Sequence, residues 1–262
     1  MEDAIRNEID PRAGVARIVL NRPDRRNALG AELVAELKES LALAEADDRV
    51  RVVAIAGEGP DFCGGADLRE VRESVEEGVL ASLLDAESLG DLFLLLRRME
   101  TPVVALVHGR ALGGGCGLAT ACDLVLASEG ARLGYPEVRL GFVPAMVMAI
   151  LRRSVGEKRA FELVALGDAI DAATARDWGI VNRVFPDATF REDAAAFVAD
   201  LASRSVSALA LSKRLLYQID GASFEASIRA GAQVNALARL TDDCQEGFRA
   251  FLERRGPSRG ER

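Results

Sequence analysis

The chain has 262 residues, enough to bury one large core and close to the size at which cores begin to divide. Hydrophobic residues make up 49% and charged residues 28%, which is typical of a globular protein and unlike a disordered or fibrous chain. The formal net charge is -8, so we expect no nucleic-acid partner, because capture of phosphates requires a basic surface.

Short β-branched runs alternate with helical patterns, and this alternation predicts an α/β fold. The expected strands, in chain order, are residues 16–20, 50–56, 103–107 and 123–127. The expected helices are residues 31–44, 86–99, 114–121, 158–166 and 172–178. From Arg191 onward the pattern is helical only. We therefore predict a core, residues 1–195, and a helical C-terminal region, residues 196–262, that packs on the core or on a neighbouring subunit.

The cysteines, the histidine and the apolar runs limit which metal sites and which cellular locations we expect. The four cysteines, Cys63, Cys116, Cys122 and Cys244, show no metal-ligand spacing, and His108 is the single histidine. We expect reduced thiols and no metal site, as in a cytoplasmic protein. The longest apolar run, residues 141–151, is about half of a membrane span, and the acidic amino terminus is unlike a signal peptide, so we expect no membrane association.

Two glycine-rich segments, residues 57–67 and 109–117, each follow an expected strand and lead toward a helix. Neither contains the G-x-G-x-x-G or P-loop pattern, and no G-x-S-x-G is present. Glycine lets a ligand oxygen approach backbone N–H groups closely, and a helix N-terminus adds positive potential. Two such loops facing each other would form an oxyanion hole. Each loop taken alone is better explained by tight turns.

Several motifs occur together over nearly the whole chain. They are LNRPDRRNAL at 20–29, VVAIAGEGPDFCGGADL at 52–68, VHGRALGGGCGLATACDLVLAS at 107–128, YPEVRLGFVPA at 135–145 and EGFRAFLERR at 246–255. In order and spacing they resemble the enoyl-CoA hydratase/isomerase, or crotonase, family. The resemblance implies a spiral core of repeated β-β-α units and a helical C-terminal region that forms homotrimers or dimers of trimers. It also implies acyl-CoA thioester substrates, with coenzyme A part of the substrate and no separate cofactor.

The same resemblance implies roles for individual residues. Gly64 and Gly114 match the two oxyanion N–H donors, and Glu137 matches a catalytic carboxylate. The positions that match the coenzyme A contacts are Arg25, Arg26, Ala66, Asp67, Leu68, Phe251 and Arg254. In some members the last two come from a neighbouring subunit. Asp67 and Asp123 are also interpreted as structural caps or loop ties.

One position departs from the pattern of well-studied hydratases, which carry a second catalytic glutamate where this chain has Gly117. We expect reversible hydration of a 2-enoyl-CoA, with a branched, methylglutaconyl-like thioester as one candidate substrate. The alternatives are a Δ3,Δ2-enoyl-CoA isomerase with a single glutamate, a decarboxylase, and a non-catalytic acyl-CoA-binding or RNA-binding relative. If the pocket has room, Gly117→Glu is expected to raise hydration.

Overall fold

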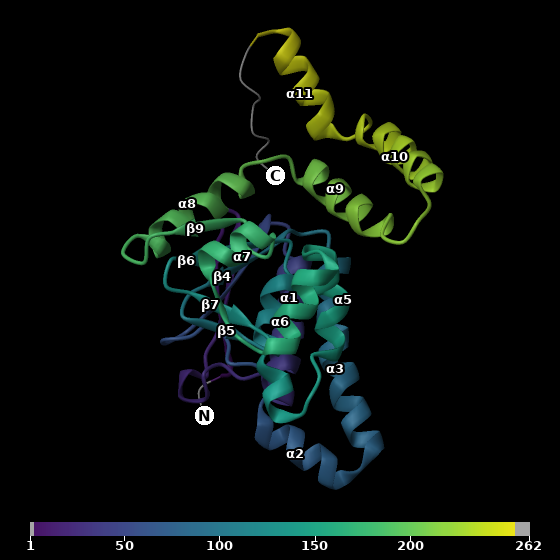
Figure 1. Cartoon of the computed structure of the whole chain (residues 1–262). Helices are drawn as coiled ribbons and strands as arrows, with labels where there is room; N and C mark the ends of the chain where they lie inside the picture. The colour runs from purple at the N-terminus through teal and green to yellow at the C-terminus, as the bar shows by residue number, and fades with distance from the viewer. Residues whose placement is uncertain (1–2, 255–262) are drawn as a thin grey trace.

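The computed structural model describes residues 3–254, and a six-stranded sheet forms its centre (Figure 1). The strands run in the order β1-β2-β3-β4-β6-β9, with β1 antiparallel to β2 and all the other neighbours parallel. Their bounds are Ile5–Asp10, Val15–Leu20, Val52–Gly57, Val103–Val107, Leu124–Ser128 and Arg183–Phe185. The four strands expected from the sequence are therefore confirmed within two residues at each end. Residues of β3 are buried throughout, as expected for an inner parallel strand.

A second layer of short strands accompanies the main sheet. It consists of β5 (Arg110–Leu112), β7 (Arg132–Gly134) and β8 (Ile170–Asp171). Two isolated parallel bridges join Leu29 to Ala66 and Cys63 to Ala111. Through these bridges the second layer also includes segments that precede β5 in the chain. After a strand of the main sheet, the chain thus makes a short second-layer pairing before it enters a helix. This is the predicted repeat of β-β-α units, and its turns place both glycine-rich segments in the second layer.

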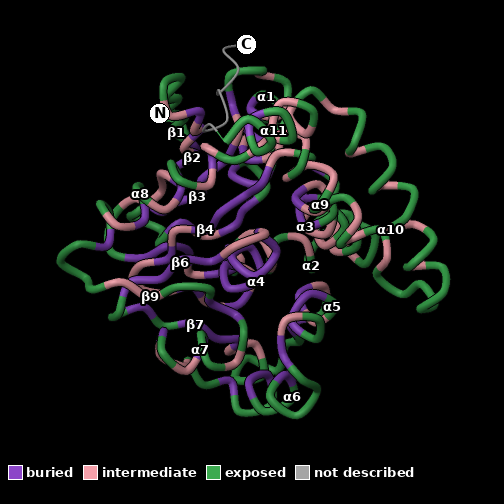
Figure 2. The backbone as a smooth tube through the Cα atoms, turned by 90° about the horizontal axis from the view of Figure 1, so that it is seen from above, coloured by how far each residue is buried: buried purple, intermediate pink, exposed green. Residues whose placement is uncertain are grey.

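Helices lie on one side of the sheet, some packed against its strands and others packed on those helices. They are α1 (Ala31–Ala46), α2 (Leu68–Glu77), α3 (Val79–Arg98), α4 (Gly114–Ala121), α5 (Ala145–Ser154), α6 (Glu157–Leu166) and α7 (Ala172–Trp178). Leu33, Leu37 and Leu41 recur at helical spacing on α1 and are fully buried against the sheet (Figure 2). Helices α4 and α7 have the expected bounds, whereas α3 begins seven residues earlier than expected. Helices α2 and α5 were not among the expected helices.

The opposite face of the sheet is covered by α8 (Phe190–Ala202). Phe190, Ala194, Val198 and Ala202 share one stripe of this helix and pack with residues of β3, β4 and β6. Burial of this stripe keeps the whole helix on the sheet. The predicted boundary at residue 195 therefore falls inside a helix that packs with the core.

Helices α9 (Val206–Gln218), α10 (Phe224–Ala238) and α11 (Asp242–Leu252) extend away from the sheet (Figure 1). Buried Lys213 of α9 forms an ion pair with Asp123 at 2.8 Å, and the Tyr217 hydroxyl donates to the same carboxylate at 2.8 Å. Asp123 is thus confirmed as a structural tie. Phe224 and Phe251, on α10 and α11, are 84% and 82% exposed. Within the described residues, no single helix is long and apolar enough to span a membrane; α8 and α9 pass that test only together, across a 97° bend.

Candidate active site

Asn27 fixes the first glycine-rich segment in place. It is fully buried with φ 54°, a left-handed conformation that asparagine adopts more readily than most residues. Its side-chain amide donates to the carbonyls of Glu58, Asp61 and Phe62 at 2.9, 2.9 and 3.1 Å, and its oxygen accepts from the Arg22 N–H. One side chain therefore joins residues 22–27 to the loop after β3. Sequence reasoning missed this positioning residue, whose available signal was a lone Asn in the LNRPDRRNAL motif.

Two unpaired backbone N–H groups meet where this loop approaches α4. Among the described residues, neither the Ala66 N–H nor the Gly114 N–H donates a hydrogen bond. A Cβ placed on Gly114 would lie 3.7 Å from the Ala66 nitrogen, so the two residues adjoin. Gly114 is the first residue of α4, where the helix adds positive potential. The pair is suited to hold a negatively charged oxygen.

The predicted donor Gly64 is wrong. Its N–H donates to the Arg26 carbonyl at 2.7 Å and is therefore not free for a ligand. Gly65, with φ 108°, turns the chain between Gly64 and Ala66. A Cβ on Gly65 would lie 2.9 Å from the Leu112 carbonyl oxygen, so this turn requires glycine. The free donor is consequently two residues further along the chain, at Ala66.

Glu137 lies in a short 3-10 helix, Pro136–Leu140, that follows β7. Its Oε1 would be 2.9 Å from a Cβ on Gly113, the residue before the Gly114 donor. Its Oε2 is buried and has no hydrogen-bond partner among the described residues. Burial raises the pKa of the Glu137 carboxyl, and a hydrogen bond from its own backbone N–H partly offsets this. Glu137 is therefore a half-buried carboxyl, beside an unpaired N–H, that keeps its proton to a higher pH than usual.

Gly117 faces apolar side chains rather than an open site. A Cβ at this position would lie 2.1 Å from Val147 Cγ1 and 3.3 Å from Phe93 Cζ. The condition set for Gly117→Glu to raise hydration, that the pocket has room, is therefore not met, because α5 fills the space that a longer side chain would need.

Two cavities meet at Ala66 and Asp67, which line both. The first has a volume of about 270 Å³ and is lined by Asp24, Arg25, Ala28, Ala66, Asp67, Leu68 and Arg69. The second, of about 230 Å³, lies between α1, α2 and α3 and is closed by Phe142 and Met146. A thioester at Ala66 would thus have a polar cavity on one side and a mainly apolar one on the other.

The first cavity groups four of the predicted coenzyme A residues, namely Arg25, Ala66, Asp67 and Leu68. Arg26 is not among its lining residues. Arg69, which sequence reasoning missed, adds a second guanidinium. Asp67 also acts as the predicted cap, because its carboxylate accepts from the Arg69 N–H at 3.0 Å at the start of α2.

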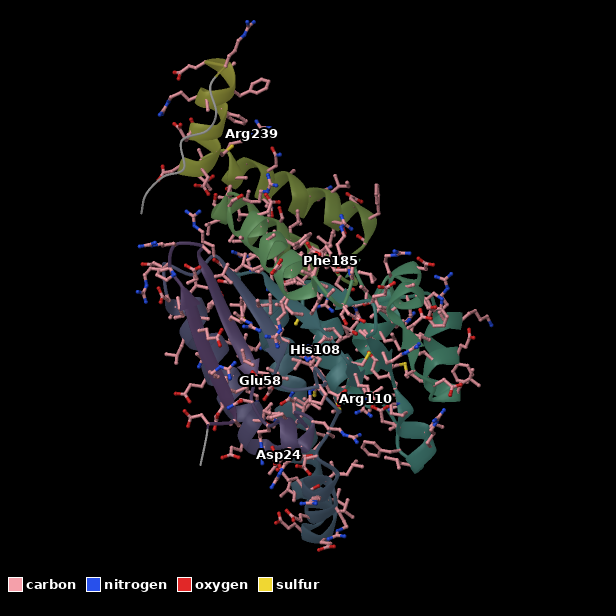
Figure 3. The ribbon with its side chains drawn as sticks, turned by 90° about the vertical axis from the view of Figure 1, so that its left-hand side faces the viewer. Asp24, Glu58, His108, Arg110, Phe185 and Arg239 are labelled. Carbon is pink, nitrogen blue, oxygen red and sulfur yellow. The ribbon has the colours of Figure 1, made fainter. Side chains whose placement is uncertain are left out.

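The remaining predicted coenzyme A residues lie elsewhere in the chain. Phe251 is on α11 and Arg254 follows it, whereas Asp24, the chain neighbour of Arg25, lies at the opposite end of the molecule from α11 (Figure 3). Within one chain these residues cannot contact the first cavity.

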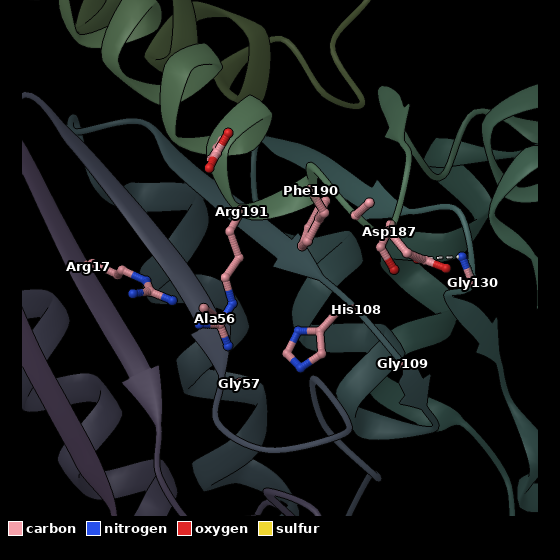
Figure 4. Close-up of a pocket in the computed structure, with 12 residues that line it drawn as sticks. Arg17, Ala56, Gly57, His108, Gly109, Gly130, Asp187, Phe190 and Arg191 are labelled. Atoms are coloured by element: carbon pink, nitrogen blue, oxygen red, sulfur yellow. Dashed lines mark hydrogen bonds between the residues drawn. The ribbon is translucent and has the colours of Figure 1, made fainter.

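His108 and the cysteines are not part of the candidate active site formed by the two N–H groups and Glu137. His108 Nε2 lies 2.8 Å from the Gly59 carbonyl oxygen, so the imidazole has a local hydrogen-bond partner. It lines a separate cavity of about 560 Å³ at the carboxyl ends of β3 and β4 (Figure 4). Burial raises the pKa of Cys63 to about 12 and that of Cys116 to about 11, so both are neutral packing residues beside the loops.

Comparison with known proteins agrees with this arrangement. Residues 10–262 match the family model for enoyl-CoA hydratase/isomerase. A Thermus thermophilus protein assigned as an enoyl-CoA hydratase is 42% identical over 93% of this chain and 96% of its own length. The 2,3-dehydroadipyl-CoA hydratase of Escherichia coli is 37% identical over 93% of this chain and 94% of its own.

Solved structures lead to the same family. The enoyl-CoA hydratase of Mycobacterium smegmatis has a TM-score of 0.91 at 31% identity, covering 98% of this chain and 99% of that one. Human enoyl coenzyme A hydratase domain-containing protein 3 has a TM-score of 0.92 at 27% identity, covering 98% and 100%. The fold is that of the crotonases. The chain belongs to the enoyl-CoA hydratase/isomerase family and is an enzyme that acts on acyl-CoA thioesters.

Proposed function

We propose that the protein reversibly adds water across the double bond of a 2-enoyl-CoA thioester. One observation carries the proposal: the unpaired N–H groups of Ala66 and Gly114 adjoin each other beside the unpartnered Oε2 of Glu137. The two donors would bind the thioester oxygen as it gains negative charge. A donor of this kind contributes about 3 kcal/mol to the transition state in a site shielded from water.

In the proposed complex the thioester lies at the junction of the two cavities. The coenzyme A part would occupy the cavity with Arg25 and Arg69, whose guanidiniums suit phosphate oxygens. The acyl chain would enter the cavity between α2 and α3, past Leu29 and Leu89. No group beyond the thioester and water is needed.

Glu137 would supply the proton. Water first adds to the β-carbon, which gives an enolate whose oxygen the two N–H groups stabilise. Protonated Glu137 then gives its proton to the α-carbon. The proton lost by the added water returns to the Glu137 carboxylate, so the enzyme is unchanged and the product is a 3-hydroxyacyl thioester. The raised pKa of Glu137 supports this role, because it preserves the acid form nearer neutral pH.

A second candidate is migration of a double bond from a 3-enoyl to a 2-enoyl thioester. The packing at Gly117 favours it, because Val147 fills the place of a second carboxylate. Glu137 alone would remove a proton from the α-carbon and return it to the γ-carbon. Both reactions share the enolate and its N–H donors. They differ in that hydration adds water at the β-carbon and a proton at the α-carbon, whereas isomerisation moves a proton from the α-carbon to the γ-carbon and adds nothing.

The test compares wild type with Glu137→Gln on crotonyl-CoA and on a 3-enoyl-CoA, followed by absorbance of the conjugated thioester and by product mass. We expect wild type to hydrate crotonyl-CoA, and Glu137→Gln to lower kcat at least about 100-fold with acyl-CoA affinity retained. Glu162→Gln, which removes an exposed carboxylate of α6, is the matched control.

The pH dependence gives a further readout. Because the acid form of Glu137 is present below its raised pKa, kcat of wild type should fall as pH rises through that value. Conversion of the 3-enoyl substrate without hydration would establish the isomerase instead. Rapid hydration by both wild type and Glu137→Gln would refute the role of Glu137.

A further inference from the structure

The cavity that receives the acyl chain in the proposed function lies in an acidic part of the molecule. Between residues 68 and 91, helices α2 and α3 carry seven Asp or Glu residues and only two Arg residues. Two of these carboxylates, Glu70 and Asp85, line the cavity together with the capping residue Asp67. The rest of the lining consists of small, hydroxyl or apolar residues, and none of it is Lys or Arg.

Glu70 is held in place by the first turn of α1. Its Oε2 accepts a hydrogen bond of 2.6 Å from the Ala31 N–H, the first residue of α1. The positive potential of a helix N-terminus favours the charged carboxylate. Glu70 therefore presents a fixed negative charge at the wall of the cavity.

Asp85 projects from α3 and has no hydrogen bond or ion pair among the described residues. Asp85 is exposed as a residue, but partial burial of its carboxyl, and then the charge of Glu70, raise its pKa, so the two carboxylates interact across this wall. The Lys38 ammonium donates a 3.1 Å hydrogen bond to the hydroxyl of Ser88, a lining residue, but Lys38 itself does not line the cavity. The carboxylates thus face the acyl chain without a lining cation to neutralise them.

We propose that Glu70 and Asp85 make this cavity selective for acyl chains that end without a negative charge. The inference rests on the proposed function, because it takes this cavity as the acyl site. A chain that ends in a carboxylate would bring a further negative charge beside Glu70 and Asp85, and the bound chain would displace water from the cavity between them. The volume of about 230 Å³ has room for about seven groups the size of a water molecule, which suits a short or medium uncharged chain.

This specificity differs from two simpler expectations. The sequence resemblance favoured a methylglutaconyl-like substrate, which ends in a carboxylate. The Escherichia coli relative is named for 2,3-dehydroadipyl-CoA, which also ends in one. The acidic lining argues that neither substrate transfers to this chain despite the shared fold.

The experiment compares two pairs of thioesters that differ only at the chain end. Hexanoyl-CoA and adipyl-CoA lack the double bond and report binding alone, by calorimetry. 2-Hexenoyl-CoA and 2,3-dehydroadipyl-CoA report turnover. We expect wild type to bind hexanoyl-CoA at least about tenfold more tightly than adipyl-CoA, with the same order in kcat/KM. Raising the salt concentration should narrow the difference by screening the charges.

Asp85→Asn and Glu70→Gln should each reduce the preference for the uncharged chain about threefold or more, and the double variant should reduce it further. Glu73→Gln removes an exposed carboxylate of α2 that does not line the cavity, and should leave the ratio unchanged. Equal affinity of wild type for hexanoyl-CoA and adipyl-CoA would overturn the inference. So would a ratio that Asp85→Asn and Glu70→Gln both leave unaltered. Because the saturated pair measures binding without turnover, a protein that fails to hydrate enoyl-CoA still gives a decisive answer here.

Discussion

The packing of Gly117 against Val147 gives a prediction whose size follows from the geometry. In Gly117→Ala the new Cβ would lie 2.1 Å from Val147 Cγ1, whereas ordinary contacts begin near 3.4 Å. Helices α4 and α5 must separate by more than an ångström or Val147 must leave its rotamer, at a cost of about 3 kcal/mol for overpacking in a tight core. Alanine regains about 1 kcal/mol of helix propensity, so the net loss should be about 2 kcal/mol of unfolding free energy.

A double-mutant cycle isolates this contact. Val147→Ala alone should cost about 2 kcal/mol, because it removes two buried methyl groups. In the double variant the clash disappears, since the Val147 Cβ itself would be 3.1 Å from the new group, a distance that a small shift relieves. The double variant should therefore be at least about 1 kcal/mol more stable than the sum of the single effects predicts.

The measurement is urea unfolding at one fixed protein concentration, because self-association would shift the apparent stability. Changes in midpoint at constant m report the unfolding free energy. A Gly117→Ala protein as stable as wild type would refute the packing described here, and so would strictly additive effects in the double variant. The cycle also bears on chemistry: Gly117→Glu should fold poorly alone, whereas adding Val147→Gly should restore folding and raise crotonyl-CoA hydration.

Two more predictions concern the coenzyme A cavity and the C-terminal helices. Arg69→Glu and Arg25→Glu should each weaken coenzyme A binding about tenfold or more, and the affinity of wild type should fall as the salt concentration rises. Arg72→Glu, on the exposed side of α2, is the control. If calorimetry shows unchanged affinity in both test variants, the phosphates bind elsewhere. The exposed apolar residues of α10 and α11 predict a homotrimer or a dimer of trimers, since they are too numerous for a free surface. Sedimentation that shows a stable monomer at micromolar concentration would contradict this. In such an assembly Phe251 and Arg254 would reach the coenzyme A cavity of a neighbouring subunit.

Local patterns determined much of this fold. The β-branched runs of β3 and β4 and the helical stripe of α1 follow from burial on one or both faces, so their positions were predictable from spacing. The segment 114–121 was also predictable as a helix because it follows a glycine turn. Helix α2 was missed because it is short and mostly charged: Leu68, Val71 and Val75 keep helical spacing, but they are its only apolar residues and none of them is fully buried. Glu137 and the two glycine-rich segments came from motif resemblance, since each has a simpler explanation when taken alone.

Only the tertiary structure decided which backbone groups are free. Gly64 and Ala66 are two residues apart in one motif, yet the Arg26 carbonyl occupies the N–H of the first and leaves the second open. Similarly, Gly117 looked like an empty place for a carboxylate until Val147, thirty positions later, proved to fill it. The acidic wall formed by Glu70 and Asp85 also depends on two helices facing one cavity. Residues distant in the chain decide whether an N–H group is already hydrogen-bonded, whether a side chain has room, and whether charges lie together. The spacing of residues along the sequence does not show these contacts.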